Sequence, residues 1–119
     1  MFAGALARLG ALAARVQPLF VSIDPERDTP KALRDYMQNF DSRVLPLTGS
    51  AAQLRRAANA FGVVFYKVPG AAPDDYTFAH NAILTLVGPE GGIVTRFSSE
   101  IAADDLARSL QRMIDPIGP

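Results

Sequence analysis

A short apolar run that stops at a proline is the feature that most constrains the fold. The stretch "LFVSI" at 19–23 is apolar and β-favouring, which predicts a strand covered on both faces. The dipeptide "DP" at 24–25 ends this strand, because proline has no N–H to give to a β-ladder. Thr29 then fits the N-cap of a helix, and Pro30 fits its first position. The stretch therefore predicts a buried strand joined to a helix by a charged turn.

Helical and strand patterns alternate along the rest of the chain. Helices are predicted over about 3–15, 30–40, 51–61 and 102–114, and strands over 17–23, 44–49, 63–68, 81–87 and 93–97. The segment 69–80 is predicted to be a long irregular loop, because it is rich in Pro, Gly and Asp. This alternation favours an α/β fold with a mixed sheet flanked by helices. The first predicted element is a helix. Because a strand precedes the helix of a βαβ unit, that strand is expected to be missing.

The composition excludes several classes of function. A chain of 119 residues with 49% apolar residues is expected to form one domain, 1–119, with a real core. Its formal net charge of 0 gives no electrostatic footprint for nucleic acid, and no basic run suggests a membrane surface. With no cysteine, the chain itself has no disulfide, thiol nucleophile or thiolate metal site. Residues 1–18 are interpreted as a domain helix, not as a targeting or membrane-spanning segment.

Two residues stand out as candidates for a site. His80 is the only histidine, and a lone histidine where a loop meets a strand is most often structural. Asp24 directly follows a strand, and ligands of α/β sheets bind beyond the carboxyl ends of the strands. Alternatively, the charged residues at 24–28 fold the turn through hydrogen bonds and ion pairs. For Asp24 both interpretations stay open. No Ser-His-Asp arrangement, phosphate-binding loop or metal-hydrolase motif is present, so no enzyme is expected.

Four stretches carry a family resemblance. They are "VQPLFVSIDPERDTPKAL", "LPLTGS", "AFGVVFYKVP" and "YTFAHNAILTLVGPEGGIVTRF", in that order. On these stretches the sequence resembles the SCO/SenC family of thioredoxin-like copper proteins. The resemblance implies a thioredoxin-like fold and a copper site made of two cysteines in a Cys-x-x-x-Cys loop and one histidine, which corresponds to His80. It also allows Asp24 to line that site. The family often has an acidic residue before this histidine, where this chain has Ala79.

The resemblance begins after the cysteine loop. It therefore implies that the domain is N-terminally incomplete, with the thiolates and the central strand lying before Met1. Tight copper binding by this chain is not expected, because Cu(I) prefers thiolates and because Met37 and Met113 are predicted to lie in the core. Without the central strand, the strands at 17–23 and 82–87 are expected to keep open edges. Such a chain would fold poorly, rearrange, or form a strand-exchanged homo-oligomer.

The function implied by the resemblance is that of a copper chaperone in cytochrome c oxidase assembly. Its partners would be a cytochrome c oxidase subunit or another copper chaperone. Its location would be a membrane-anchored one, on the periplasmic face of the bacterial inner membrane or in the mitochondrial intermembrane space. The alternatives are a thiol–disulfide redox protein of thioredoxin-like type and a degenerate, non-catalytic interaction module. The redox alternative requires the same cysteines.

Overall fold

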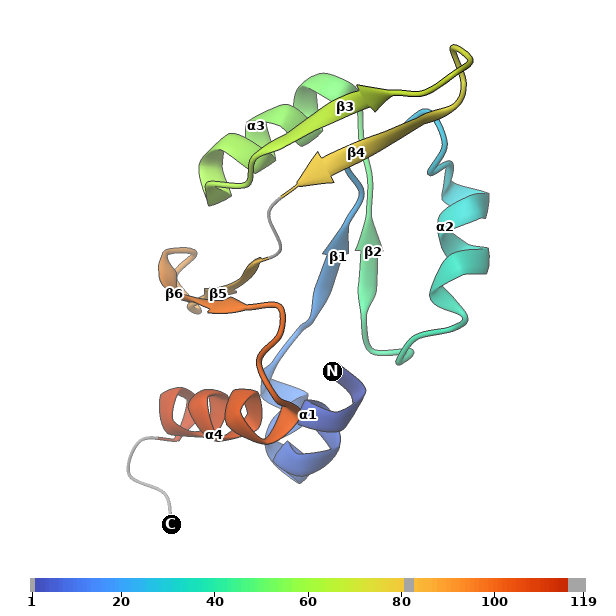
Figure 1. Ribbon diagram of the computed structural model, residues 1–119. Coiled ribbons are helices and arrows are strands. Elements are labelled where there is room, and N and C mark those ends of the chain that lie inside the picture. Colours follow the sequence, from blue (N-terminus) through green and yellow to red (C-terminus); the bar gives the residue numbers. More distant parts are fainter. Residues whose placement is uncertain (1, 81–82, 116–119) are drawn as a thin grey trace. The chain divides into compact units, whose positions relative to one another are not determined.

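The computed structural model describes residues 2–80 and 83–115 (Figure 1). Its contacts divide the chain into two compact units. One unit comprises the residues up to Thr48 together with those from Glu100 onward, and the other comprises Gly49–Ser99. Each unit is described by itself below. The single domain expected over 1–119 stays a prediction.

The first unit begins with a helix that changes type in its middle. The α-helix α1 (Phe2–Leu9) is followed directly by the 3-10 helix η1 (Gly10–Arg15), where the sequence predicts one helix over 3–15. Gly10 has a φ of 58°, in the left-handed region that glycine adopts without steric cost. The α-helical hydrogen-bond pattern therefore ends at this residue.

The helix α4 (Ala103–Ile114) packs against α1. Together with η1, these two helices supply most of the buried apolar side chains of this unit. Its first turn carries Asp104 and Asp105, as predicted, where negative charge suits the helix dipole. The buried side chains of the two helices and η1 are Ala5, Leu6, Leu9, Ala13, Leu106, Ala107 and Leu110. Arg8 of α1 forms an ion pair with Asp104, so polar contacts at the surface accompany the apolar packing.

Two short parallel strands form the sheet of the first unit. β1 (Leu19–Val21) pairs with β2 (Leu45–Leu47), and Phe20 lies opposite Pro46. The helix α2 (Pro30–Met37) comes between them in the chain, and its N-cap Thr29 accepts a hydrogen bond from the backbone N–H of Ala32. Both the cap and the proline at the start of α2 agree with the sequence prediction.

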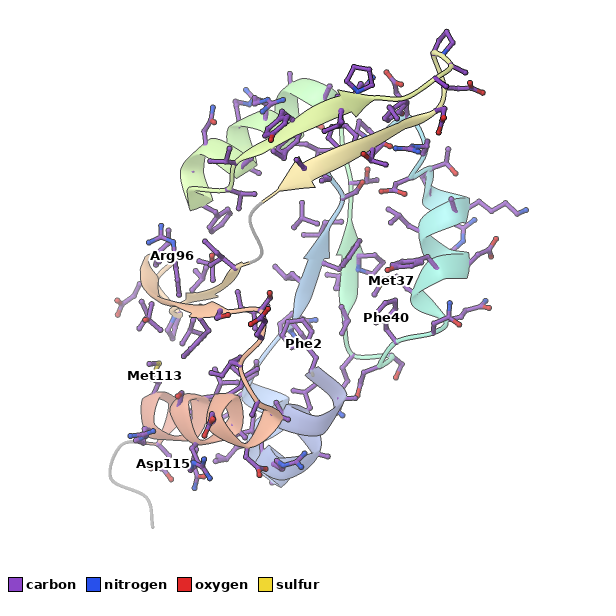
Figure 2. The ribbon with its side chains drawn as sticks, viewed as in Figure 1. Phe2, Met37, Phe40, Arg96, Met113 and Asp115 are labelled. Carbon is purple, nitrogen blue, oxygen red and sulfur yellow. The ribbon has the colours of Figure 1, made fainter. Side chains whose placement is uncertain are left out.

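The two methionines predicted to lie in the core are only partly covered. Met37 is half-buried on the side of α2 that faces β2 (Figure 2). Met113, near the end of α4, is 45% exposed, so its prediction as a core residue is wrong. The amphipathic stripe of α4 is formed by Leu110, about one turn before Met113, and Leu106, about two turns before it. Met113 extends past that packed region.

The second unit begins with α3 (Ala51–Phe61), whose two ends follow the sequence signals. Ser50 accepts a hydrogen bond from the N–H of Gln53, and the Gln53 side chain accepts one from the N–H of Ser50, which completes a capping box. Gly62 ends the helix with a φ of 70°. Leu54 and Ala58 are buried on its inner face.

A hairpin replaces the long loop that the sequence predicts over 69–80. β3 (Phe65–Pro69) pairs antiparallel with β4 (Tyr76–His80), and only the residues between them form the turn (Figure 1). The loop prediction is therefore wrong over β4. Tyr76 and Phe78 alternate with small side chains, as a strand requires, and Phe78 packs edge-on against Phe65 at 5.9 Å between ring centroids.

A second hairpin agrees with its prediction. β5 (Ile83–Val87) pairs antiparallel with β6 (Ile93–Ser98) across a glycine-rich turn. Within that turn Gly91 has a φ of 91°, which favours glycine. The register shifts between Leu86 and Val87, as at a β-bulge.

The described strands form three separate pairs. One pair is parallel and two are antiparallel, so both kinds of pairing expected of a mixed sheet occur. Among the described residues, β1 pairs with β2 alone in the first unit, and β5 pairs with β6 alone in the second. The open edges expected for the strands at 17–23 and 82–87 stay a prediction.

Candidate functional site

The turn after β1 is built around two buried polar residues. Ser22 is 2% exposed and Asp24 is 7% exposed. The Ser22 hydroxyl accepts a hydrogen bond of 3.1 Å from the backbone N–H of Asp24 and donates one of 2.6 Å to Oδ2 of Asp28. The backbone carbonyl of Asp24 in turn accepts a bond of 2.8 Å from the N–H of Asp28. These contacts fold the chain back on itself where the strand ends.

Arg27 closes the same turn over the carboxylate of Asp24. Its Nε donates a hydrogen bond of 2.5 Å to Oδ2 of Asp24, and its backbone N–H lies 3.4 Å from Oδ1. The Asp24 side chain is nearly covered, whereas half of the Arg27 side chain is exposed. The prediction that ion pairs and hydrogen bonds fold this turn is therefore confirmed for Asp24, Arg27 and Asp28. A role of Asp24 in lining a metal site stays a prediction.

Ser22 is the residue of this turn that the sequence analysis did not single out. Its hydroxyl accepts from Asp24 and donates to Asp28, which ties the strand end to the turn. This role could have been recognised in the sequence, because Ser22 is a serine within an apolar strand and lies two residues before an aspartate. Serine side chains commonly bond to nearby backbone N–H groups in this way.

His80 is the last residue of β4, and its backbone lies opposite that of Phe65. Its side chain lies outside the described part of the structure, and so does Asn81. Asp24 belongs to the first unit and His80 to the second, so each is placed only within its own unit. The assignment of His80 as a copper ligand therefore stays a prediction.

Aromatic side chains of β3 and β4 contact cationic side chains, and one of these contacts joins the hairpin to α3. The guanidinium of Arg55 lies 4.1 Å from the ring centroid of Phe65 and donates to the carbonyl of Phe65. The ammonium of Lys67 lies 4.1 Å from the ring of Tyr76. Cation–π contacts of this kind add to apolar packing. Phe65 and Tyr76 are buried, so the strand that ends in His80 is anchored by packing.

The donors available to a metal ion within this chain are few. Among the side chains of residues 2–79 and 83–115, no three Asp or Glu groups gather in a way that could hold a metal ion. The soft donors in the chain are three methionine thioethers, since it has no cysteine. Cu(I) prefers thiolate and thioether sulfur, with imidazole as a further ligand. The described residues therefore do not assemble a complete Cu(I) site by themselves.

A second charged turn lies before β2. Arg43 donates to both carboxylate oxygens of Asp41, over 2.9 Å and 2.7 Å, and its backbone N–H also donates to Asp41. The hydrogen bond from the Arg43 side chain lowers the pKa of Asp41 from 3.8 to about 2, and that from its backbone N–H adds to the effect. The side-chain hydrogen bond to Asp41 in turn raises the pKa of Arg43. In the sequence, an aspartate two residues before an arginine is the pattern that could have indicated this pair.

A shallow hollow of about 380 Å³ lies beside this turn in the first unit. Its lining is mostly small and apolar, with Ala13, Ala14, Val16, Gln17, Ser42, Arg43, Val44 and Leu45 around it. Asp24 does not line it. Gln17 is held there by hydrogen bonds to the carbonyls of Pro18 and Arg43. The hollow has no carboxylate or imidazole in its lining and thus no donor set for a metal.

Comparison with known proteins relates this fold to one family. The SCO1/SenC family model matches residues 1–115. The "Protein SCO2 homolog, mitochondrial" of Bos taurus is 36% identical over 97 residues, which cover 82% of this chain and 36% of the bovine protein. The chain thus spans about a third of the length of this curated relative.

Solved structures agree in fold over nearly all of the chain. Bradyrhizobium japonicum ScoI with copper bound is 32% identical and has a TM-score of 0.83, covering 93% of this chain and 70% of that one. Arabidopsis thaliana ScoI with copper bound is 27% identical and has a TM-score of 0.85, covering 97% of this chain and 71% of that one. These matches confirm the predicted α/β, thioredoxin-like fold. The match of the family model over 1–115 and the likeness in fold lead to one conclusion: the chain belongs to the SCO1/SenC family.

Proposed function

We propose that this chain is the scaffold and imidazole part of a copper chaperone that serves cytochrome c oxidase assembly. The observation that carries the proposal is the match, over 93% of the chain, to a ScoI structure with copper bound. The role in oxidase assembly follows from the family resemblance. The partners would be a cytochrome c oxidase subunit or another copper chaperone. No catalytic step is assigned to the chain.

His80 is proposed as the nitrogen ligand of Cu(I). It corresponds to the family's histidine and is the last residue of β4. This strand contains the buried Tyr76 and pairs with β3 at the buried Phe65. A strand end anchored in this way would hold an imidazole more firmly than a free loop. The sulfur ligands would come from outside these 119 residues.

Asp24 is proposed to shape the rim of the site rather than to bind the metal. Its carboxylate is engaged by Arg27, and Ser22 holds its backbone N–H. A carboxylate is also a hard ligand, which Cu(I) does not favour. The proposed role is therefore to fix the direction of the chain beyond the carboxyl end of β1.

The proposed location is a membrane-anchored one, on the periplasmic or intermembrane-space side. The support is the family resemblance, together with the mitochondrial relative from cattle. In the described part of the chain, no helix is both long and apolar enough to cross a bilayer.

The test supplies the missing sulfur in trans. The untagged chain is mixed with Cu(I) and a synthetic Cys-x-x-x-Cys peptide, and copper K-edge X-ray absorption is recorded with and without the chain. Because His80 is the only histidine, imidazole scattering that requires the chain identifies this residue as a ligand. The scattering should disappear in His80→Ala and persist in Asp24→Asn. A spectrum with sulfur ligands alone in the presence of the folded chain would overturn the proposal.

A further inference from the structure

The hairpin of the second unit has one end that its turn does not close. The turn joins Pro69 of β3 to Tyr76 of β4, whereas the pair Phe65–His80 lies at the opposite end of the register. A two-stranded ribbon is marginally stable by itself, and its end away from the turn opens most readily. The backbone of His80 therefore depends on contacts other than the turn.

Arg55 of α3 makes such a contact at this end. Its Nη1 donates a hydrogen bond of 3.2 Å to the backbone carbonyl of Phe65, and its guanidinium carbon lies 4.1 Å from the centroid of the Phe65 ring. A charged donor forms a stronger hydrogen bond than a neutral one, and a cation over an aromatic ring adds to it. One side chain thus holds both the main chain and the ring of the residue that pairs with His80.

The ring of Phe65 connects this contact to β4. Phe65 is 7% exposed, and its ring packs edge-on against that of Phe78 at 5.9 Å between centroids. Phe78 in turn packs edge-on against Tyr76 of the same strand, at 5.8 Å. Aromatic pairs in this geometry stabilise a fold beyond the area that they bury. A displacement of Phe65 would therefore change the packing of β4 as well as its pairing.

We infer that Arg55 is a positioning residue for the copper site, because it fixes the end of β4 from which His80 would bind Cu(I). This inference rests on the proposed role of His80 as a ligand. Arg55 itself does not bind the metal, since a guanidinium offers no lone pair. It acts through Phe65, and all three residues belong to the second unit, Gly49–Ser99.

The neighbouring Arg56 provides a matched control. It follows Arg55 on α3 and is exposed to solvent. Arg55→Met and Arg56→Met remove the same charge from the same helix and replace arginine by a residue of similar helix propensity. They differ in the contact with Phe65, which Arg55 makes. Arg55→Lys keeps the charge but loses the flat guanidinium, so it should retain part of that contact.

The first measurement uses the full chain with Cu(I) and the Cys-x-x-x-Cys peptide. Arg55→Met should weaken the imidazole scattering in copper X-ray absorption and lower the affinity of the mixture for Cu(I) about tenfold. Arg56→Met should match the wild-type chain, and Arg55→Lys should lie between. A residue with a merely structural role would lower the stability of the chain without changing copper binding by the folded protein.

The second measurement is hydrogen exchange without copper. In Arg55→Met, exchange should quicken about tenfold for the amides at the Phe65–His80 end of the hairpin and much less for those at the Pro69–Tyr76 end. Protection of the α3 amides shows that a variant is folded. If Arg55→Met fails this check, Arg55→Gln, which keeps an N–H donor but no charge, replaces it.

The outcomes separate this inference from the proposed function. A wild-type chain that shows no imidazole scattering would overturn the ligand role of His80 and this inference with it. Imidazole scattering that is present in the wild-type chain and equally strong in Arg55→Met would overturn this inference alone. Exchange at the Phe65–His80 end that is unchanged in Arg55→Met, or equally fast in Arg56→Met, would do the same.

Discussion

The Nε atom of Arg27 donates a hydrogen bond of 2.5 Å to Oδ2 of Asp24, in the turn that follows β1. The Asp24 side chain is only 10% exposed to solvent, whereas the Arg27 side chain is 49% exposed. Ser22 binds the backbone of the same aspartate, so Asp24 is held from both its main chain and its side chain. These contacts fix the course of the chain where β1 ends.

Replacing Asp24 should destabilise the first unit. Asp24→Ala removes the acceptor of the Arg27 side chain, and we expect the free energy of unfolding to fall by about 1–3 kcal/mol. Urea denaturation measures this loss. Asp24→Asn, which keeps the shape and one acceptor oxygen, should lose less. Equal stability of wild type and Asp24→Ala would show that the turn does not depend on this carboxylate.

The Asp41–Arg43 pair predicts a specific dependence on pH. The folded-state pKa of Asp41 is lowered from 3.8 to about 2, mainly by the hydrogen bond from the Arg43 side chain. A lowered carboxyl pKa means that the pair stabilises the fold fully above 3.8 and that this contribution is lost as the pH falls through about 2. NMR titration of the Asp41 carboxyl carbon should give a midpoint near 2.

The control for this titration is Arg43→Gln. Removing the guanidinium should move the Asp41 midpoint back toward 3.8, because the largest cause of the shift is gone. The stability difference between wild type and Asp41→Asn should likewise shrink as the pH falls below 3.8. A midpoint of 3.8 in the wild-type chain would contradict the observed pairing.

Gly70 is required by the turn between β3 and β4. A Cβ atom at this position would lie 1.8 Å from the backbone carbonyl oxygen of Asp75, a distance that only a backbone shift can relieve. We expect Gly70→Ala to lower stability by about 1–3 kcal/mol, as overpacking does. Hydrogen exchange at the β3 and β4 amides should report the loss locally.

Gly92 provides the matched control for Gly70. A Cβ atom there would meet nothing within 4 Å, so Gly92→Ala should leave the exchange rates of both hairpins nearly unchanged. Similar effects of the two substitutions would mean that the close approach at Gly70 does not constrain the turn.

Local signals predicted much of the fold, because they involve residues close in sequence. The caps at Thr29 and Ser50 and the glycine at Gly62 were predicted from residue type, and each satisfies backbone groups within one helical turn. The Asp24–Arg27 contact spans three residues. The sequence predicts ion pairs within the turn at 24–28 without naming this pair, and it leaves the role of Asp24 open. Such contacts need no knowledge of the tertiary structure.

Longer-range features were harder to predict. The sequence predicts a loop where the strand ending in His80 lies, because Pro, Gly and Asp in the preceding turn mask the alternation around Tyr76 and Phe78. That alternation is stabilised by pairing with β3, and strand propensity depends strongly on such context. The role proposed for His80 came from family resemblance, since a single histidine carries no spacing pattern. Met113 shows the same limit: apolar spacing on α4 did not reveal where the packing ends.

The central claim is that this chain provides an imidazole ligand for Cu(I) but lacks the sulfur ligands that would hold the ion tightly. The most direct test is a competition titration of the untagged chain with Cu(I) and a strong Cu(I) chelator, alongside His80→Ala. The account predicts that the chelator removes all copper from both proteins, and that added Cys-x-x-x-Cys peptide lets only the wild-type chain compete. Retention of stoichiometric Cu(I) by the wild-type chain without the peptide would contradict it.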